Sequence, residues 1–428
     1  MAATLITGGR VIDPAENLDA VRDVLLHEGK VAAIGERLAA PSDAERVDAR
    51  GKWVLPGFID LHVHLREPGD EYKETVATGV ASAVAGGFTT IVSMPNTRPV
   101  NDTVAVTELI LERARQAQKA RVVPAGAITV GLKGETLSEI GDLVAAGCRA
   151  ITDDGRPVMN AGLMRRALEY AQLFDIPVMV HEEDLDLSKG GVMNEGPIAT
   201  KLGLRGVPNA AEVAMVVRDI ALLEEVGGHL HIAHLSCAGS VRAVREARAR
   251  GLHVTAEAAP HHFTLTDEAV GCYHTHAKMS PPLRNDADRE AVIAAMADGT
   301  IDAIATDHAP HSLVEKDVEF DVAANGIVGL ETALPLTLAL VKAGRLSVKR
   351  AIELLTSGPA ETFGLPGGTL AVGAPADVTL VDAEASWKVE PEKFASKSRN
   401  SPFAGWTVQG RVEQTFVGGV RVFSREHA

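Results

Sequence analysis

Three scarcities in this chain of 428 residues exclude classes of protein. Its only cysteines, Cys148, Cys237 and Cys272, form an odd and widely spaced set, which predicts no disulfide framework and fits a reducing cytoplasm. No apolar stretch approaches the roughly 20 residues that a membrane-spanning helix needs, and the N-terminus lacks the basic start of a secretory signal. We therefore expect a cytoplasmic protein that is neither secreted nor bound to a membrane.

Positive charge is also scarce. The chain has 42 Lys and Arg residues against 57 Asp and Glu residues, a formal net charge of −15. Such a surface repels a phosphate backbone, so we expect no nucleic-acid partner. Neither low-complexity runs nor short repeats are visible, and 46% hydrophobic with 23% charged residues is ordinary globular composition. The length allows one large domain of the barrel class with a small companion.

The two ends of the chain share one character. Residues 1–55 and 365–428 contain short β-like segments separated by Gly or Asp, such as residues 4–7, 23–26, 377–382 and 412–417, and no long helix. These segments could combine into one β-rich satellite domain, which leaves residues 56–364 as the main domain.

Within the main domain, short apolar segments alternate with helical patterns. The strand candidates are residues 54–61, 90–93, 122–127, 150–152, 178–180, 230–233, 254–256 and 303–305, and helices are predicted at 103–120, 164–173, 210–225, 241–250 and 288–297. This alternation predicts an α/β fold, a (β/α)8 barrel of the TIM type. A doubly wound open sheet is the alternative, but it would leave eight parallel strands without closure. Functional residues of such barrels lie at the C-terminal ends of the strands.

His62 and His64 lie at the end of the first predicted strand. Alternate residues of a strand point the same way, so both imidazoles can bind one metal ion. Taken alone, the pair is equally typical of ordinary polar residues at a strand end. Further ligand types follow later strands: Asp153 and Asp154, His181, His234 and Asp307. Four imidazoles and two carboxylates exceed the needs of one tetrahedral Zn²⁺ with an open position, which favours two ions bridged by a carboxylate and a hydroxide. Zinc suits these ligands best, and Mn²⁺, Co²⁺ or Fe²⁺ could substitute.

These residues stand in longer motifs that resemble a known family. They are Asp60-Leu-His-Val-His-Leu-Arg-Glu-Pro68, Met94-Pro-Asn-Thr97, Thr152-Asp-Asp-Gly155, Ala259-Pro-His-His262, Met279 to Arg284, Ala305 to His311 and Gly326 to Pro335. Over nearly its whole length the chain is similar to the dihydroorotases of the bacterial class I type, in the amidohydrolase superfamily.

The resemblance implies a role for each candidate ligand. His62 and His64 would hold the more buried ion with Asp307, and His181 and His234 the second ion. Many relatives bridge the ions with a carbamylated lysine on the fourth strand, but the segment Arg149-Ala-Ile-Thr-Asp-Asp154 contains no lysine. We therefore expect Asp154 to be the bridge. Its neighbour Asp153 would face the other way, and His261, His262 and His308 are expected to be structural or to lie outside the ligand set.

The resemblance also implies a reaction and its substrate contacts. Dihydroorotases convert N-carbamoyl-L-aspartate reversibly into (S)-dihydroorotate and water in pyrimidine (UMP) biosynthesis. A metal-bridging hydroxide and Asp307 as general acid and base would carry it out. Arg66 lies two residues beyond His64 and is expected on the same face of an extended chain, where it offers a planar fork for the substrate carboxylate. The other expected substrate contacts are His64, Asn96, Ser280, His311, Asn325 and Gly326.

Two positions depart from the family pattern. Ser280 stands where relatives usually present Asn, and Ala324-Asn325-Gly326 replaces the usual Pro-Phe-Gly. A serine reaches less far than an asparagine, so affinity for the substrate could differ. Residues 311–321 between these positions mix charges with few helix signals, as expected of a loop that closes over substrate.

Two alternative functions and two partners are considered. In a cyclic amidohydrolase of the hydantoinase or allantoinase type, Arg66 and Asn96 would have no carboxylate to bind. A noncatalytic homologue that scaffolds aspartate transcarbamoylase would lack metal ligands, and none is missing here. We expect a homodimer, and association with aspartate transcarbamoylase is compatible with an active enzyme.

Overall fold

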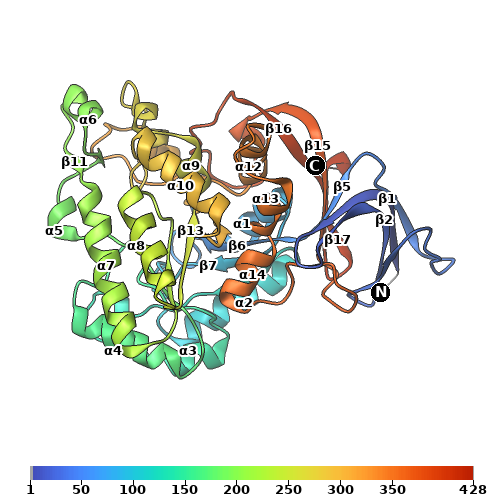
Figure 1. The fold of residues 1–428 in the computed structure, drawn as a ribbon, viewed down its shortest axis with the longest axis horizontal. Helices are drawn as coiled ribbons and strands as arrows, with labels where there is room; N and C mark the ends of the chain where they lie inside the picture. The colour runs from blue at the N-terminus through green and yellow to red at the C-terminus, as the bar shows by residue number, and fades with distance from the viewer. Residues whose placement is uncertain (1–2, 428) are drawn as a thin grey trace.

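A barrel of parallel strands forms the body of the molecule in the computed structural model, which describes residues 3–427 (Figure 1). Its strands are β6 (Phe58–Val63), β7 (Phe88–Ser93), β8 (Arg121–Pro124), β9 (Val178–Val180), β12 (Leu230–Ile232), β13 (Val254–Ala258) and β14 (Ala303–Ile304). The pairs β6 with β7, β7 with β8, β9 with β12, β12 with β13 and β13 with β14 are all parallel. The barrel closes where Val63 pairs with His308 and the His64 amide donates to the His308 carbonyl at 2.9 Å. The predicted (β/α)8 barrel is confirmed.

The fourth strand is reduced to single bridges. The sequence predicts a strand at residues 150–152, and the structure has Ile151 paired with Gly126 on one side and Val178 on the other. The Thr152 amide donates to the Gly126 carbonyl at 2.8 Å, and the Met179 amide to the Ile151 carbonyl at 2.9 Å. This segment is too short for a ladder, because the chain turns away directly after Thr152. The turn brings Asp153 and Asp154 to the rim.

Helices cover the outside of the barrel. The longer ones are α1 (Val76–Ala85), α2 (Val104–Ala117), α4 (Ala161–Gln172), α7 (Asn209–Val226), α8 (Ala238–Ala249), α10 (Asp286–Asp298) and α12 (Ala333–Lys342). Shorter ones are α3 (Ile140–Ala146), α5 (Leu185–Ser188), α6 (Pro197–Leu202), α9 (Pro260–Thr264), α11 (Leu313–Lys316), α13 (Val348–Glu353) and α14 (Ser357–Phe363). Helix α4 shows why they form: Asn160 caps it by accepting from the Leu163 amide, and Leu163, Ala167 and Ala171 lie along its buried face. Five of the helices match the predicted ones, with α4 and α8 each beginning three residues earlier than predicted.

A second sheet combines strands from both ends of the chain, visible in Figure 1 as blue and red arrows beside the barrel. Its order is β17-β16-β15-β5-β1-β2-β3, with β4 paired to β1. The bounds are β1 (Thr4–Asp13), β2 (Leu18–His27), β3 (Lys30–Gly35), β4 (Glu45–Asp48), β5 (Trp53–Pro56), β15 (Val378–Lys388), β16 (Thr407–Val417) and β17 (Val420–Ser424). A separate apolar core joins Ile6, Val24 and Val54 to Val378 and Phe416. The predicted β-rich unit built from both chain ends therefore exists, while its exact limits at residues 55 and 365 stay a prediction.

The predicted strand at 54–61 is wrong in one respect, because the structure divides it between the two sheets. β5 pairs with β1 and β15 in the satellite sheet, and β6 begins the barrel. Gly57 lies between them, where a Cβ atom would come within 2.3 Å of the Thr89 side chain. The uniformly apolar sequence hides this change of sheet, and only the glycine marks it.

A separate two-stranded sheet also forms. A parallel pair of two-residue strands, β10 (Met193–Asn194) and β11 (Gly206–Val207), lies in the segment between β9 and α7. No helix within residues 3–427 is long and apolar enough to cross a membrane. The cytoplasmic location stays a prediction.

Candidate metal centre

The six predicted metal ligands converge on one rim of the barrel. His62 lies in β6, His64 directly after it, Asp154 after the Ile151 bridge, His181 after β9, His234 after β12 and Asp307 after β14. They meet because the C-terminal ends of parallel barrel strands share one face. All six residues are buried, with His181 the most exposed at 6%.

The carboxylate of Asp154 lies in the middle of this group. Its Oδ1 is 3.3 Å from His62 Nε2 and 3.7 Å from both His181 Nδ1 and His234 Nε2. Its Oδ2 is 3.5 Å from His64 Nε2. Asp153 faces away and accepts from the amide and the hydroxyl of Thr129. The structure thus brings Asp154, and not Asp153, to all four imidazoles.

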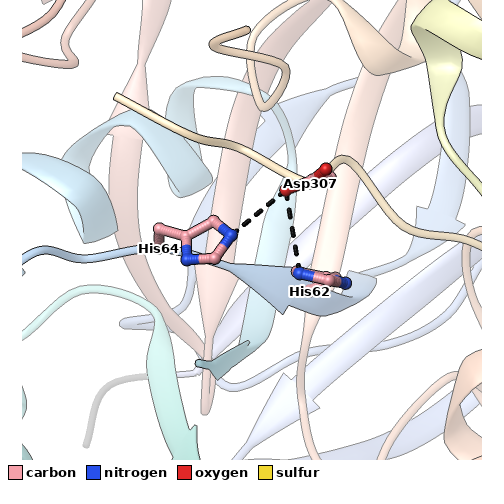
Figure 2. A group of neighbouring side chains, drawn as sticks. All are labelled: His62, His64 and Asp307. Carbon is pink, nitrogen blue, oxygen red and sulfur yellow. Dashed lines mark hydrogen bonds and ion pairs between the residues drawn. The ribbon is translucent and has the colours of Figure 1, made fainter. Parts of the chain in front are cut away.

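Asp307 lies beside the two histidines of the first strand, as Figure 2 shows. Its Oδ1 is 3.2 Å from His64 Nε2 and 3.7 Å from His62 Nε2. Two groups of three residues each hold their ligand atoms within 4.8 Å of one another. One group is His62, His64 and Asp307, and the other is His62, Asp154 and His234. Among the described residues the buried His62 Nε2 has no hydrogen-bond partner. Buried nitrogen and carboxylate donors around such an atom fit a metal ion.

The electrostatics of the site also fit a cation. Burial opposes ionisation of Asp154 and Asp307, but the charge of His62 and hydrogen bonds from other histidines hold the pKa of both carboxyls below the usual range. Burial likewise opposes protonation of His181, yet Asp154 and Glu183 raise its pKa to about 10. The carboxylates also raise the pKa of His62. Carboxylates that favour positive charge on neighbouring imidazoles also favour a bound cation.

Partners outside the ligand set orient three of the histidines. His62 Nδ1 is 3.0 Å from Glu257 Oε1, His64 Nδ1 is 2.9 Å from Asn96 Oδ1, and His181 Nε2 is 3.3 Å from Glu183 Oε2. Such partners fix which ring nitrogen faces the metal. The sequence interpretation did not single out Glu183 or Glu257. Glu183 could have been found from its position two residues after His181, and Glu257 from its position next to a predicted strand end.

The backbone is left-handed at three residues of the rim. The φ angles are +61° at Arg66, +30° at His234 and +45° at Asp307. For residues with a Cβ atom this conformation costs about 1–3 kcal/mol each and is usual at functional sites. The expectation that Arg66 continues an extended strand from His64 is therefore wrong, although its side chain does line the cavity.

A cavity of about 440 Å³ opens above the ligands. The predicted substrate contacts His64, Arg66, Asn96, Ser280, His311 and Asn325 line it, together with Glu183, Leu185, Val192 and Met279, which were not predicted. Gly326 is not part of the wall, because its amide donates to the Lys278 carbonyl and its carbonyl accepts from Asn400.

Two wall residues have different contacts from those expected. The Asn96 amide donates to Asp154 Oδ2 at 3.3 Å while its carbonyl faces His64, so both polar atoms contact candidate ligands. The Ser280 hydroxyl donates to Glu183 Oε2 at 3.3 Å.

Arg66 forms no ion pair with a neighbouring acid in the described part of the chain. Its nearest acidic neighbours in sequence have other partners, since Glu67 pairs with Arg113 at 3.1 Å and Asp70 lies 3.8 Å from Lys73. Within residues 3–427 no ion pair joins Arg66 to a carboxylate. Its Nε donates to the Pro310 carbonyl at 3.2 Å, and Nη2 lies 3.4 Å from His311 Nε2. An unpaired guanidinium in the wall of a cavity is suited to bind an anionic ligand.

Comparisons with known proteins agree with this geometry. A family described as dihydro-orotase-like matches residues 51–240, and the amidohydrolase family matches residues 209–423. A dihydroorotase of Anaeromyxobacter dehalogenans is 61% identical over 425 residues, which cover 99% of this chain and 98% of that protein. The chain belongs to the dihydroorotase family. Another member, from Syntrophotalea carbinolica, is 56% identical over 415 residues, 97% of both chains.

Solved structures of other amidohydrolases share the fold of this dihydroorotase family member. An L-hydantoinase (dihydropyrimidinase) from Arthrobacter aurescens has a TM-score of 0.89 at 26% identity, with 99% of this chain and 97% of that chain covered. A D-hydantoinase (dihydropyrimidinase) from Thermus sp. has a TM-score of 0.83 at 26% identity, with 98% and 95% covered. Hydantoinases are thus distant structural relatives, and much higher identity is found among dihydroorotases.

The raised pKa values predict that metal binding to this family member releases protons. At pH 7 the metal-free protein holds protons on His62 and His181, whose pKa values are raised, in the latter case to about 10. A metal ion must displace them, so affinity should rise with pH by about tenfold per unit for each proton released. Calorimetric titration with Zn²⁺ at pH 7, in buffers of different ionisation enthalpy, measures the release.

The His181→Asn variant should release fewer protons than the wild type in the same titration. An apparent binding enthalpy that is independent of the buffer would contradict the assignment of these imidazoles.

Proposed function

We propose that this chain catalyses the reversible cyclisation of N-carbamoyl-L-aspartate to (S)-dihydroorotate and water, with two zinc ions at the rim of the barrel. The observation that carries the proposal is the unpaired Arg66 guanidinium in the cavity wall, next to a buried group of histidines and aspartates. A cyclic amide that carries a carboxylate needs both features. The identity to dihydroorotases of 61% over nearly the whole chain supports this substrate.

The proposed ligand sets follow from the distances. His62, His64 and Asp307 would hold one ion, His181 and His234 the other, and Asp154 would contribute an oxygen to both. When bound, the ions would lower the pKa of a water molecule towards neutrality and polarise the amide carbonyl of the substrate. Imidazole and carboxylate ligands are well suited to zinc.

Asp307 is the proposed general acid and base. Its carboxylate lies in the cavity wall and is ionised, because the charge of His62 and the hydrogen bond from His64 outweigh the effect of burial on its pKa. It can accept a proton from the attacking water and deliver it to the ring nitrogen as the amide bond breaks. In the cyclisation direction Asp307 returns the proton along the same path.

Arg66 is the proposed anchor of the substrate carboxylate. Its Nε and one hydrogen of Nη2 face Pro310 and His311, which leaves Nη1 and the other Nη2 hydrogen for a ligand. Burial, followed by the charge of Arg66, lowers the pKa of His311 to about 3. His311 is therefore neutral near pH 7, and it supports Arg66 through a hydrogen bond without adding charge.

The homodimer and the association with aspartate transcarbamoylase stay predictions.

Substrate preference tests the proposed reaction. Purified, zinc-loaded protein should hydrolyse dihydroorotate far faster than hydantoin or allantoin, because only dihydroorotate offers a carboxylate to Arg66. Initial rates at matched concentrations measure the ranking. A preference for hydantoin would mean that the activity is that of the hydantoinases and not that of the dihydroorotases. It would reject the proposal.

The Arg66→Gln variant tests the carboxylate anchor. A hydrogen bond to a charged group contributes about 1.5–3 kcal/mol, so KM for dihydroorotate should rise roughly 10–150-fold while zinc content stays unchanged. Arg66→Lys should recover part of the affinity, since a lysine keeps the charge without the planar fork. An unchanged KM in both variants would mean that the carboxylate binds elsewhere.

The Asp154→Asn variant tests the shared ligand. Removing the anionic oxygen between the two histidine pairs should lower bound zinc from two equivalents per chain to one or fewer, as measured by elemental analysis after dialysis. Asp153→Asn is the matched control, because that carboxylate faces Thr129, and it should retain two equivalents. Two equivalents in Asp154→Asn would exclude Asp154 as the bridge.

A further inference from the structure

A chain of polar side chains leads away from His62, through the barrel interior and towards the end opposite the metal centre. Glu257 Oε1 is 3.0 Å from His62 Nδ1, and Glu257 Oε2 is 3.1 Å from His231 Nε2. His231 Nδ1 is 2.8 Å from Thr255 Oγ1, which in turn is 2.6 Å from His229 Nε2. Each distance is that of a hydrogen bond.

The strand geometry explains why these side chains meet. His229 and His231 are two residues apart at the start of β12, and Thr255 and Glu257 are two residues apart in β13, so each pair points to one side of its strand. The two strands are paired in parallel with His231 opposite Thr255. Both pairs therefore face the barrel interior at successive levels below His62.

This series of hydrogen-bonded side chains is buried at the His62 end and reaches solvent at the His229 end. His62, Glu257 and His231 are 0% exposed, and the Phe363 ring packs edge-on against His231 at 5.1 Å. His229 is half-buried and stacks on the exposed His253 ring at 3.9 Å. A buried carboxylate without partners would be strongly unfavourable. The two imidazoles, together with the His234 amide that donates to Glu257 Oε1 at 3.4 Å, allow Glu257 to remain there.

If Glu257 is ionised and His231 is neutral, one arrangement of hydrogens satisfies every link when His62 binds a metal through Nε2. His62 must then carry its hydrogen on Nδ1 and donate it to Glu257. Glu257 accepts a second hydrogen from His231 Nε2, which leaves His231 Nδ1 to accept from the Thr255 hydroxyl. The Thr255 oxygen accepts from His229 Nε2. In this arrangement every donor points towards Glu257.

We propose that Glu257, His231 and Thr255 are positioning residues of the metal centre. Through this chain they hold His62 in the tautomer and orientation that bind a metal, and the carboxylate makes its Nε2 a stronger ligand. This inference rests on the proposed function only in requiring His62 to be a metal ligand. A core network with a purely structural role would affect folding and leave metal affinity unchanged.

Zinc affinity of the full-length protein, measured by competition with a chromophoric chelator, tests the proposal. Glu257→Gln should bind Zn²⁺ about 10–100-fold more weakly, the usual effect of removing such an outer partner. Its amide can still accept from His62, but the negative charge is gone. Thr255→Val should weaken binding to a smaller extent, and Thr255→Ser, which restores the hydroxyl, should recover the wild-type affinity.

The matched control is Thr415→Val in β16. The Thr415 hydroxyl is also bonded within the fold, to the Val84 carbonyl at 2.8 Å, but it lies in the satellite sheet. This variant should bind zinc like the wild type. Thermal unfolding of the EDTA-treated proteins separates loss of folding from loss of affinity, and KM for dihydroorotate at saturating zinc should not change in the Thr255 variants.

The outcomes are distinct. If Glu257→Gln folds and binds zinc as tightly as the wild type, the positioning role is rejected while the metal centre stands. If Glu257→Gln does not fold, the two Thr255 variants test the proposal instead. Equal zinc affinities of Thr255→Val and Thr255→Ser would reject the role of the hydrogen-bonded side chains. Failure of the wild type itself to bind zinc would reject the proposed function instead.

Discussion

The whole rim is organised around two buried carboxylates, Asp154 and Asp307, in the lining of the cavity. Taking one such charge out of water costs several kcal/mol even after relaxation, so the fold must supply positive charge or hydrogen donors from all sides. Four imidazoles do so, and they come from the ends of three strands, β6, β9 and β12. The barrel is the scaffold that brings them together, because its parallel strands all end on the same face.

This constraint extends to both sides of the ligands. Above them, Arg66 forms no ion pair with a carboxylate among the described residues, so its guanidinium can bind an anionic group of a ligand. Below them, Glu257 adds a further buried carboxylate, which lies in the barrel between His62 and His231. The left-handed backbone at Arg66, His234 and Asp307 lies at the same rim, so some backbone strain is found where side chains must converge.

Sequence reasoning was sufficient where the alternation of side chains along a strand determines which way a residue points. The alternation of a strand predicted that His62 and His64 share a face and that Asp153 faces away from Asp154, and the structure has this arrangement. The same reasoning failed where the backbone departs from regular strand geometry. The left-handed turn at Arg66 breaks the assumed extended chain, and Gly57 transfers the chain from one sheet to another within an apolar run. Glu257 was not anticipated because its partners lie 195 and 26 residues away in sequence, and only the closed barrel brings them together.

The serine at position 280 shows how a departure from a family pattern is absorbed. Its short hydroxyl does not stay free in the cavity but donates to Glu183, whose carboxylate also contacts His181 Nε2 at 3.3 Å. Ser280 thereby becomes part of the support of a candidate metal ligand. Burial would raise the pKa of Glu183, but His181 and Ser280 are among the groups that lower it to about 2. A longer asparagine side chain would reach further over the cavity. At this position the chain has exchanged reach towards a substrate for a hydrogen bond that stabilises the carboxylate behind His181.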